Sequence, residues 1–272
     1  MNVHHESLLN SHIPRGLGVH DEIVFKAQSL SCRYAQSLPL VLQDVSFELR
    51  AGELLGVCGR TGSGKSTLSL VMLRCIEMIE GTMLIDGVDA LKLPLVEYRR
   101  IIQLFPQDSA IFSGTVRAFL DPYDIFSDVK INAVLTALTR VIKAKTSGDD
   151  MENFMLPLNM HISRGGGNLS AGQKQILALG RACLASDAKV VILDEITSNM
   201  DKEVASAAIK VIKTELASRR IAVLLIAHRM EDITACDHVM IMSQGRIIER
   251  GEPCDLLNDD KSILAGMIRE IN

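Results

Sequence analysis

The sequence lacks the features that mark membrane-spanning and secreted proteins. Its longest apolar run covers residues 221–227, far fewer than the roughly 20 residues that a membrane-spanning helix needs. The N-terminal stretch is polar and has no apolar segment of the kind found in secretory signal peptides. We therefore expect a chain that is soluble on its own and faces the cytosol.

Signals for metal and nucleic-acid binding are also scarce. The six cysteines are scattered without C-x-x-C spacing, and the seven histidines include no H-x-x-x-H pair. A zinc site is therefore not expected, and the cysteines are interpreted as reduced residues of the core. The formal net charge of -4 gives no general electrostatic attraction to DNA or RNA, so no nucleic-acid partner is expected.

What the sequence does contain is a glycine-rich run between a predicted strand and a predicted helix. Apolar residues 54–58 precede the run, and apolar positions from 68 to 76 follow it with helical spacing. The G-x-x-x-x-G-K-S pattern in this context predicts a P-loop that binds a nucleoside triphosphate. The alternative is a glycine-rich turn before an ordinary helix. The run consists of Gly59, Arg60, Thr61, Gly62, Ser63, Gly64, Lys65, Ser66 and Thr67.

Each part of the predicted P-loop has a chemical role. The glycines allow backbone N–H groups to close around a phosphate chain, and the start of the following helix adds unpaired donors. Lys65 would reach the β- and γ-phosphates, and the hydroxyl of Ser66 would ligate Mg²⁺.

A pair of acids follows a second buried strand. Residues 190–193 are all apolar, which is typical of a parallel strand, and Asp194 and Glu195 come directly after them. The carboxyl ends of such strands are where α/β folds bind ligands. We expect Asp194 to hold Mg²⁺ and Glu195 to orient the water that attacks the γ-phosphate. The alternative is an exposed acidic turn.

Three single residues are further candidates. Tyr34 lies upstream of the P-loop at a spacing that suits a sheet edge near an adenine, or it is a buried tyrosine of the sheet. Gln107 follows a predicted core strand, where its amide could contact Mg²⁺ or the attacking water, or it lies in an exposed turn. His228 ends the apolar run at 221–227 and could hydrogen-bond a γ-phosphate, although a lone histidine is more often structural.

The remaining pattern predicts one α/β domain over residues 22–272, preceded by a flexible segment at 1–21. Strands at 23–25, 30–34 and 45–49 predict an antiparallel sheet beside the P-loop core. A further core strand is predicted at 99–105, and a helical insert at about 107–175. That insert includes an apolar stripe over 131–142 with Ser127 or Asp128 as its N-cap. The tail at 254–272 is expected to be helical.

A second helix start has the chemistry of an anion site. Ser170 and Gln173 have the S-x-x-Q spacing of a capping box. A capped helix start with small residues at its tip is a second surface that could bind phosphate. The alternative is a simple capped helix. Because the chain needs one nucleotide and offers two such helix starts, two copies could each complete the other's site.

Together these residues resemble the nucleotide-binding domain of ATP-binding cassette (ABC) transporters over residues 22–270. In that family residues 59–67 match the Walker A loop, Tyr34 the aromatic that stacks on adenine, and Gln107 the Q-loop. Asp194 and Glu195 match the Walker B pair, and His228 matches the switch histidine. Residues 198–201, with Ser198 and Asp201, match the D-loop. The signature that covers the opposing ATP corresponds to Leu169, Ser170, Ala171, Gly172 and Gln173.

The finer resemblance is to the second cassette of subfamily C, the multidrug-resistance-associated group. It is carried by residues 107–122, 168–170 and 245–249. First cassettes of that group commonly have Asp where this chain has Glu195. Two positions depart from the family pattern. Ala171 replaces the commoner glycine of the signature, and Arg164 stands where related second cassettes often have Glu.

The resemblance implies an α/β fold with a RecA-like P-loop NTPase core, an antiparallel β subdomain and an inserted α-helical subdomain. It also implies an ATPase that uses ATP and Mg²⁺, with the metal held by Ser66, Gln107 and Asp194. Its partners would be a second cassette, identical or different and arranged head to tail, and transmembrane domains outside this chain. Such a protein acts at the cytoplasmic face of a membrane and powers export. The alternatives are a soluble non-transport ABC ATPase and a truncated cassette that binds ATP in a regulatory role.

Overall fold

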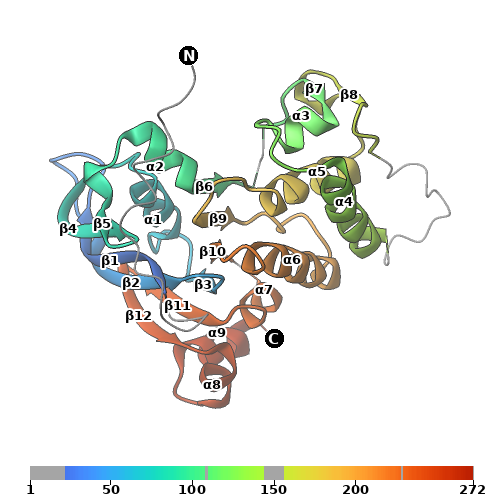
Figure 1. Ribbon diagram of the computed structural model, residues 1–272. Helices are drawn as coiled ribbons and strands as arrows, with labels where there is room; N and C mark the ends of the chain where they lie inside the picture. Colours follow the sequence, from blue (N-terminus) through green and yellow to red (C-terminus); the bar gives the residue numbers. More distant parts are fainter. Residues whose placement is uncertain (1–21, 108–109, 144–155, 228, 272) are drawn as a thin grey trace.

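The computed structural model describes residues 22–107, 110–143, 156–227 and 229–271 (Figure 1). The predicted flexible segment 1–21 and the candidate His228 lie outside the described residues.

The centre of the fold is a six-stranded sheet with the order β12-β11-β3-β10-β9-β6. Strands β11, β3, β10, β9 and β6 run parallel to one another, and β12 pairs antiparallel with β11 at the edge. The central strands are buried on both faces, which agrees with their continuous apolar sequences. The bounds are β3 Leu54–Cys58, β6 Ile102–Phe105, β9 Val190–Asp194, β10 Ala222–Ile226, β11 His238–Ser243 and β12 Arg246–Gly251.

A second, four-stranded sheet is antiparallel and has the order β2-β1-β4-β5. Its strands are β1 Ile23–Cys32, β2 Leu42–Arg50, β4 Met78–Ile85 and β5 Val88–Asp89. The prediction of two separate strands within residues 23–34 was wrong. β1 is continuous because it pairs with β2 on one side and β4 on the other. The polar interval instead forms a bulge, in which Ser29 has a φ of 49°.

The six-stranded sheet is covered on both faces. Along β10, Leu224 and Ile226 belong to a cluster shared with α1 (Lys65–Met72) and the four-stranded sheet. Val223 and Leu225, which point the other way, belong to a cluster shared with α5 (Ala171–Cys183) and α6 (Lys202–Ala217). The sheet therefore separates two hydrophobic cores, and the P-loop helix lies on the side of the antiparallel sheet.

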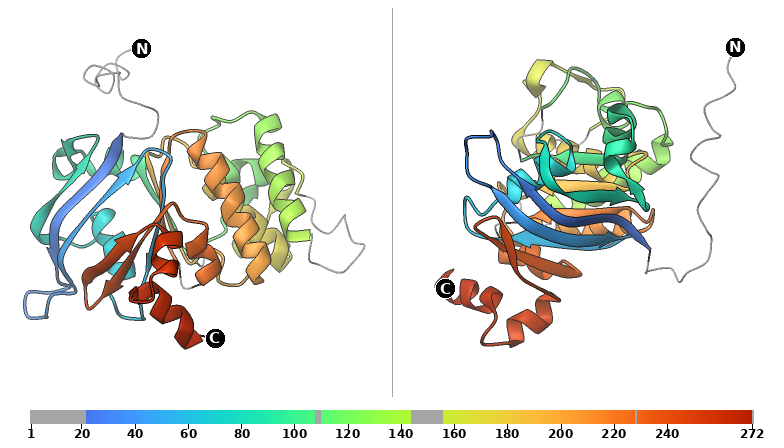
Figure 2. Two further views of the ribbon diagram at one scale, coloured as in Figure 1. Left: turned by 90° about the horizontal axis from the view of Figure 1, so that it is seen from below. Right: turned by 90° about the vertical axis from the view of Figure 1, so that its left-hand side faces the viewer.

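Helices gather at the end of the molecule opposite the four-stranded sheet (Figures 1 and 2). They are α3 (Val116–Leu120), α4 (Asp128–Lys143) and α5, with the short pair β7 (Gly114–Thr115) and β8 (His161–Ile162) beside them. The predicted apolar stripe of α4 is confirmed. Of the two candidate caps, Ser127 caps the helix, since its Oγ accepts a hydrogen bond from Lys130 N at 3.3 Å.

The remaining helices correct one prediction and confirm another. The first part of the strand predicted at 99–105 belongs to α2 (Leu95–Ile101), and only β6 is extended. The tail is helical, as predicted, and is divided into two helices, α8 (Pro253–Asn258) and α9 (Ile263–Ile271). The Glu249 carboxylate accepts hydrogen bonds from the Ile263 and Leu264 N–H groups, both at 2.9 Å, and so fixes the start of α9. Helix α7 covers Met230–Thr234.

All six cysteines lie in the described residues as unpaired thiols. Four are buried, as predicted, whereas the prediction of a core position is wrong for Cys75 and Cys254, which are exposed. Among the described helices, none is both long and apolar enough to cross a bilayer.

Candidate functional site

The predicted P-loop connects β3 to α1 and is shaped by its glycines. A Cβ atom at Gly59 would lie 2.2 Å from the Met242 carbonyl oxygen, and Gly64, the N-cap of α1, has a φ of 104°. Gly62 has a φ of 81°, and a Cβ atom there would meet no heavy atom within 4 Å. Gly59 and Gly64 thus allow close packing, whereas Gly62 keeps backbone next to open space, where a phosphate could approach.

Lys65 is folded over this loop. Its side chain is almost completely buried, and its Nζ donates hydrogen bonds to the carbonyl oxygens of Gly59 at 2.8 Å and Arg60 at 3.3 Å. Burial lowers the pKa of Lys65, and the carboxylates of Glu195 and Asp194 act in the opposite direction. The lysine therefore lies within electrostatic reach of both predicted acids.

A cavity of about 510 Å³ joins three distant parts of the sequence. A volume of this size is typical of a small-molecule site. It places the glycine-rich run, the tyrosine upstream of it and the acid after β9 around one space. Its lining residues are Tyr34, Val41, Thr61, Gly62, Gly64, Lys65, Ser66, Thr67 and Glu195.

Tyr34 is exposed rather than buried in the sheet, with 56% of its surface accessible. Its hydroxyl and the Thr67 Oγ1 lie 2.9 Å apart and share a hydrogen bond. This contact holds the ring at the rim of the cavity beside the first turn of α1. The alternative of a buried structural tyrosine is therefore wrong, and the ring is placed where a flat base could stack on it.

Glu195 occupies an unusual backbone conformation directly after β9. Its φ of 51° lies in the left-handed region that non-glycine residues rarely adopt. Two backbone hydrogen bonds hold the turn: Glu195 N donates to Ile226 O at 3.1 Å, and Ser198 N donates to Glu195 O at 3.0 Å. The strained conformation is thus fixed by the neighbouring strand β10 and by the turn that follows.

Oxygen donors suitable for Mg²⁺ are present, although no cluster of three His, Cys, Asp or Glu side chains occurs in the described residues. Mg²⁺ typically takes one or two carboxylates plus substrate phosphates and keeps several waters, so it does not require such a cluster. The Ser66 side chain is exposed in the cavity, and Asp194 ends β9 within electrostatic reach of Lys65. These residues fit a magnesium ion that arrives with a nucleotide.

The other candidates in the described part of the chain lie outside the cavity lining. Gln107 is exposed in the bend after β6, which neighbours β9 at the same sheet edge. Ser170 and Gln173 form the predicted capping box at the start of α5, with Gln173 N donating to Ser170 Oγ at 3.2 Å. Asp201 is the N-cap residue of α6. The segment 169–173 therefore does not complete the cavity within its own chain.

Part of the cavity wall was not predicted from the sequence. Val41, which lines the cavity, is positioned by the turn between β11 and β12. A Cβ atom at Gly245 would lie 2.1 Å from Val41 O, and Gly245 N donates to Ser63 O at 3.0 Å. The only signal was the Gln-Gly turn pattern at 244–245, which does not reveal what the turn packs against.

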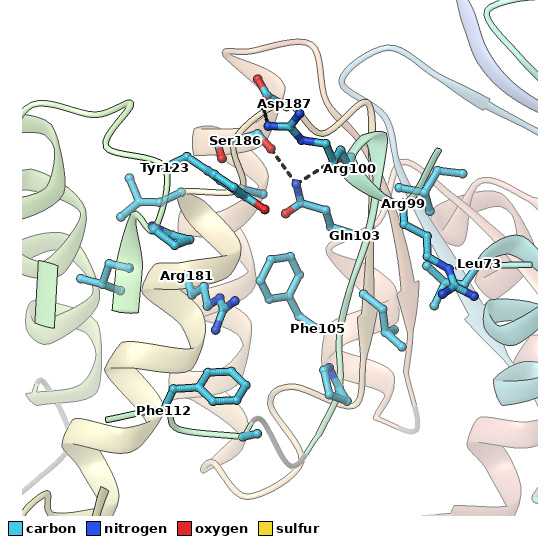
Figure 3. Close-up of a pocket in the computed structure, with 18 of the residues that line it drawn as sticks. Leu73, Arg99, Arg100, Gln103, Phe105, Phe112, Tyr123, Arg181, Ser186 and Asp187 are labelled. Atoms are coloured by element: carbon cyan, nitrogen blue, oxygen red, sulfur yellow. Dashed lines mark hydrogen bonds and ion pairs between the residues drawn. The ribbon is translucent and has the colours of Figure 1, made fainter. Parts of the chain in front are cut away.

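A second cavity, of about 540 Å³, was also not predicted (Figure 3). It lies between β6 and the helices α3 and α5, away from Lys65 and Glu195. Arg181 lines it, and its guanidinium lies 5.8 Å from the centre of the Phe112 ring and 5.1 Å from that of Phe119. Tyr123 and Arg100 stack against each other at the opposite end. This cavity combines aromatic and cationic side chains, and Lys65, Gln107 and Glu195 are not among the residues that line it.

A family model described as ABC transporter matches residues 42–198. Among curated proteins, ATP-binding cassette sub-family C member 8 of Cricetus cricetus is 38% identical over 251 residues, covering 92% of this chain and 15% of that protein. The ABC transporter ATP-binding protein/permease VMR1 of Saccharomyces cerevisiae is 35% identical over 251 residues, covering 89% and 16%. The chain thus spans about a sixth of the length of these relatives.

The fold is also similar to that of a solved ABC exporter. A structure of a bacterial Atm1-family ABC exporter with ATP bound superposes with a TM-score of 0.74 at 25% sequence identity. The match covers 91% of this chain and 42% of the exporter chain.

Proposed function

The chain belongs to the ABC transporter family, and we propose that it is an ATP-hydrolysing cassette that powers export through transmembrane domains outside this chain. One observation carries the proposal: Lys65 of the P-loop and Glu195 after β9 line the same cavity. A triphosphate bound by the first would present its γ-phosphate toward the second. The same proposal places the chain at the cytoplasmic face of a membrane.

ATP binds with its phosphates along the backbone of residues 59–67 and its base against Tyr34. Lys65 exchanges its contacts with the loop carbonyls for contacts with the β- and γ-phosphates, which are stronger acceptors. Ser66 and Asp194 would hold Mg²⁺ at the phosphates, with Gln107 as a further ligand. The bound ion supplies charge neutralisation for the terminal phosphates.

Hydrolysis needs a water aligned with the γ-phosphorus. Glu195 accepts a hydrogen bond from this water and takes its proton as the new oxygen–phosphorus bond forms. The bond between the γ-phosphorus and the bridging oxygen breaks, releasing ADP and phosphate. His228 would steady the charge on the γ-phosphate, a role that rests on its position in the sequence after β10.

A second cassette completes the site. Ser170 and Ala171 are exposed at the capped start of α5 and lie outside their own chain's cavity. In a head-to-tail pair, this helix start from one copy would cover the γ-phosphate bound by the other, with unpaired N–H groups facing the anion. ATP then favours the closed pair because it contacts both copies only in that state.

The second cavity is the proposed docking site of the transmembrane partner. Phe112 and Tyr123 are exposed large apolar side chains at this cavity, and Arg99, Arg100 and Arg181 give it a positive charge. A short helix with apolar and acidic side chains would match these surroundings. Since one wall is β6, which ends just before Gln107, movement at the cavity would reach the nucleotide edge of the sheet.

The proposal is tested by measuring phosphate release from ATP with the purified chain over a range of protein concentrations. We expect turnover whose rate per chain rises with concentration, because two copies must meet. ATP binding without turnover, even with an added second cassette, would instead identify a regulatory module. A chain that does not bind ATP would contradict the proposal altogether.

Replacing Tyr34 tests how the base is held. Tyr34→Ala should weaken ATP binding about fivefold, the effect of losing roughly 1 kcal/mol of ring contact, whereas Tyr34→Phe should stay close to wild type. For each variant, fluorescence titration measures the affinity for ATP and the affinity for inorganic triphosphate. Equal weakening for the two ligands would show that Tyr34 acts through Thr67 and not through the base.

A further inference from the structure

Residues 229–232, which follow β10, form hydrogen bonds with the turn at residues 197–200, which follows β9. The Arg229 guanidinium donates hydrogen bonds to Ser198 O at 2.5 Å and to Met200 O. Three residues further along, the Asp232 carboxylate accepts a hydrogen bond from Thr197 Oγ1 at 2.9 Å. One segment thus contacts the turn at three positions, and two of the three contacts come from a single arginine.

This turn is directly attached to the predicted catalytic acid. Ser198, whose carbonyl Arg229 binds, donates its own N–H to Glu195 O at 3.0 Å. Glu195 has a positive φ and a side chain that lines the nucleotide cavity. A non-glycine residue persists in this conformation only when surrounding contacts hold it there. Arg229 supplies such contacts without itself lining the cavity.

The contact between Thr197 and Asp232 is buried, and the two contacts of Arg229 are part-buried. Thr197 and Asp232 are 2% and 3% exposed, and Met200 is also buried. Burial raises the pKa of Asp232, while the Thr197 hydroxyl and the Arg229 charge act to lower it. A charged donor that binds two neutral carbonyl oxygens in such surroundings makes stronger hydrogen bonds than a neutral donor would.

We propose that Arg229 is a positioning residue for hydrolysis, which holds the turn after Glu195 so that the carboxylate stays aimed at the attacking water. The inference rests on the proposed ATPase function and adds a residue to it. Arg229 acts on the chemical step through the backbone of residues 195–200. Its loss should therefore lower kcat and leave nucleotide binding nearly unchanged.

Arg229→Ala is tested in the full chain by phosphate release and by nucleotide titration. We expect kcat to fall roughly 10- to 100-fold, as for a displacement of a reacting group by about 1 Å, with a change in KM below about twofold. Arg229→Lys, which keeps the charge and one donor position, should recover part of the loss, and it replaces the alanine variant if that variant does not fold. In Glu195→Gln, adding Arg229→Ala should lower kcat no further, because both changes affect one group.

Arg219→Ala is the matched control. Arg219 also donates to two backbone carbonyls, of Cys183 and Ala185, and its guanidinium lies 5.3 Å from the centre of the Phe126 ring, but it does not line the cavity. Its loss should lower the unfolding temperature without lowering kcat. The inference is overturned if Arg229→Ala keeps wild-type kcat, if Arg219→Ala loses as much, or if the double variant shows additive losses. Absence of hydrolysis in the wild-type chain would instead contradict the proposed function.

Discussion

Glu195→Gln should abolish nearly all turnover while leaving ATP binding intact. The amide keeps the size of the side chain, but it cannot accept a proton from the attacking water. Loss of general-base assistance typically costs about 10²- to 10⁴-fold in rate, so we expect kcat to fall within that range. Removing one negative charge beside the γ-phosphate should leave ATP affinity equal or higher. Phosphate release and nucleotide titration measure the two quantities separately.

The same variant should accumulate as a closed pair in the presence of ATP. Without hydrolysis, the ligand that favours the closed state remains bound. Size-exclusion chromatography with light scattering should therefore show an ATP-dependent dimer that ADP does not produce. Glu215→Gln is the control, since it makes the same substitution in an ion pair with Lys130 that lies away from the cavity. Turnover at the wild-type rate in Glu195→Gln would remove Glu195 from the mechanism.

The nucleotide cavity was predictable because its main signals are local. The glycine-rich run fixes its own loop, and the positive φ values at Gly59, Gly62 and Gly64 explain why glycine occupies those positions. The buried run before Asp194 identifies a parallel strand, and carboxyl ends of parallel strands meet at one edge of the sheet. The shared cavity of Lys65 and Glu195 follows from these two patterns.

The features that could not be predicted from the sequence depend on contacts between distant residues. Nothing near Ser29 shows that β1 continues through it, because pairing with two other strands decides this. Arg229 contacts Ser198 and Met200, which lie about thirty residues before it in the sequence. The turn at Gly245 packs against Val41, which lies near the other end of the chain. The second cavity likewise forms between elements whose spacing no local pattern specifies.

Lys65→Ala should weaken ATP binding by roughly 10- to 100-fold. A hydrogen bond between charged partners contributes about 1.5–3 kcal/mol, which corresponds to this range of dissociation constants. The stability of the nucleotide-free protein should change much less. Burial lowers the pKa of Lys65, so the charged lysine is disfavoured in the folded state. The substitution therefore separates nucleotide binding from folding.

The measurement is the ATP-dependent rise in unfolding temperature, with and without Mg²⁺. A ligand that binds the folded state stabilises it in proportion to the logarithm of its concentration over its dissociation constant, so a weaker site gives a smaller rise at each ATP concentration. Lys189→Ala is the matched control, because burial lowers the pKa of Lys189 as it does that of Lys65. Lys189 pairs with Asp86 and does not line the nucleotide cavity. That variant should lose stability and keep the full ATP-dependent rise. If Lys65→Ala also keeps it, the triphosphate does not bind at the start of α1, and the ATPase proposal fails with it.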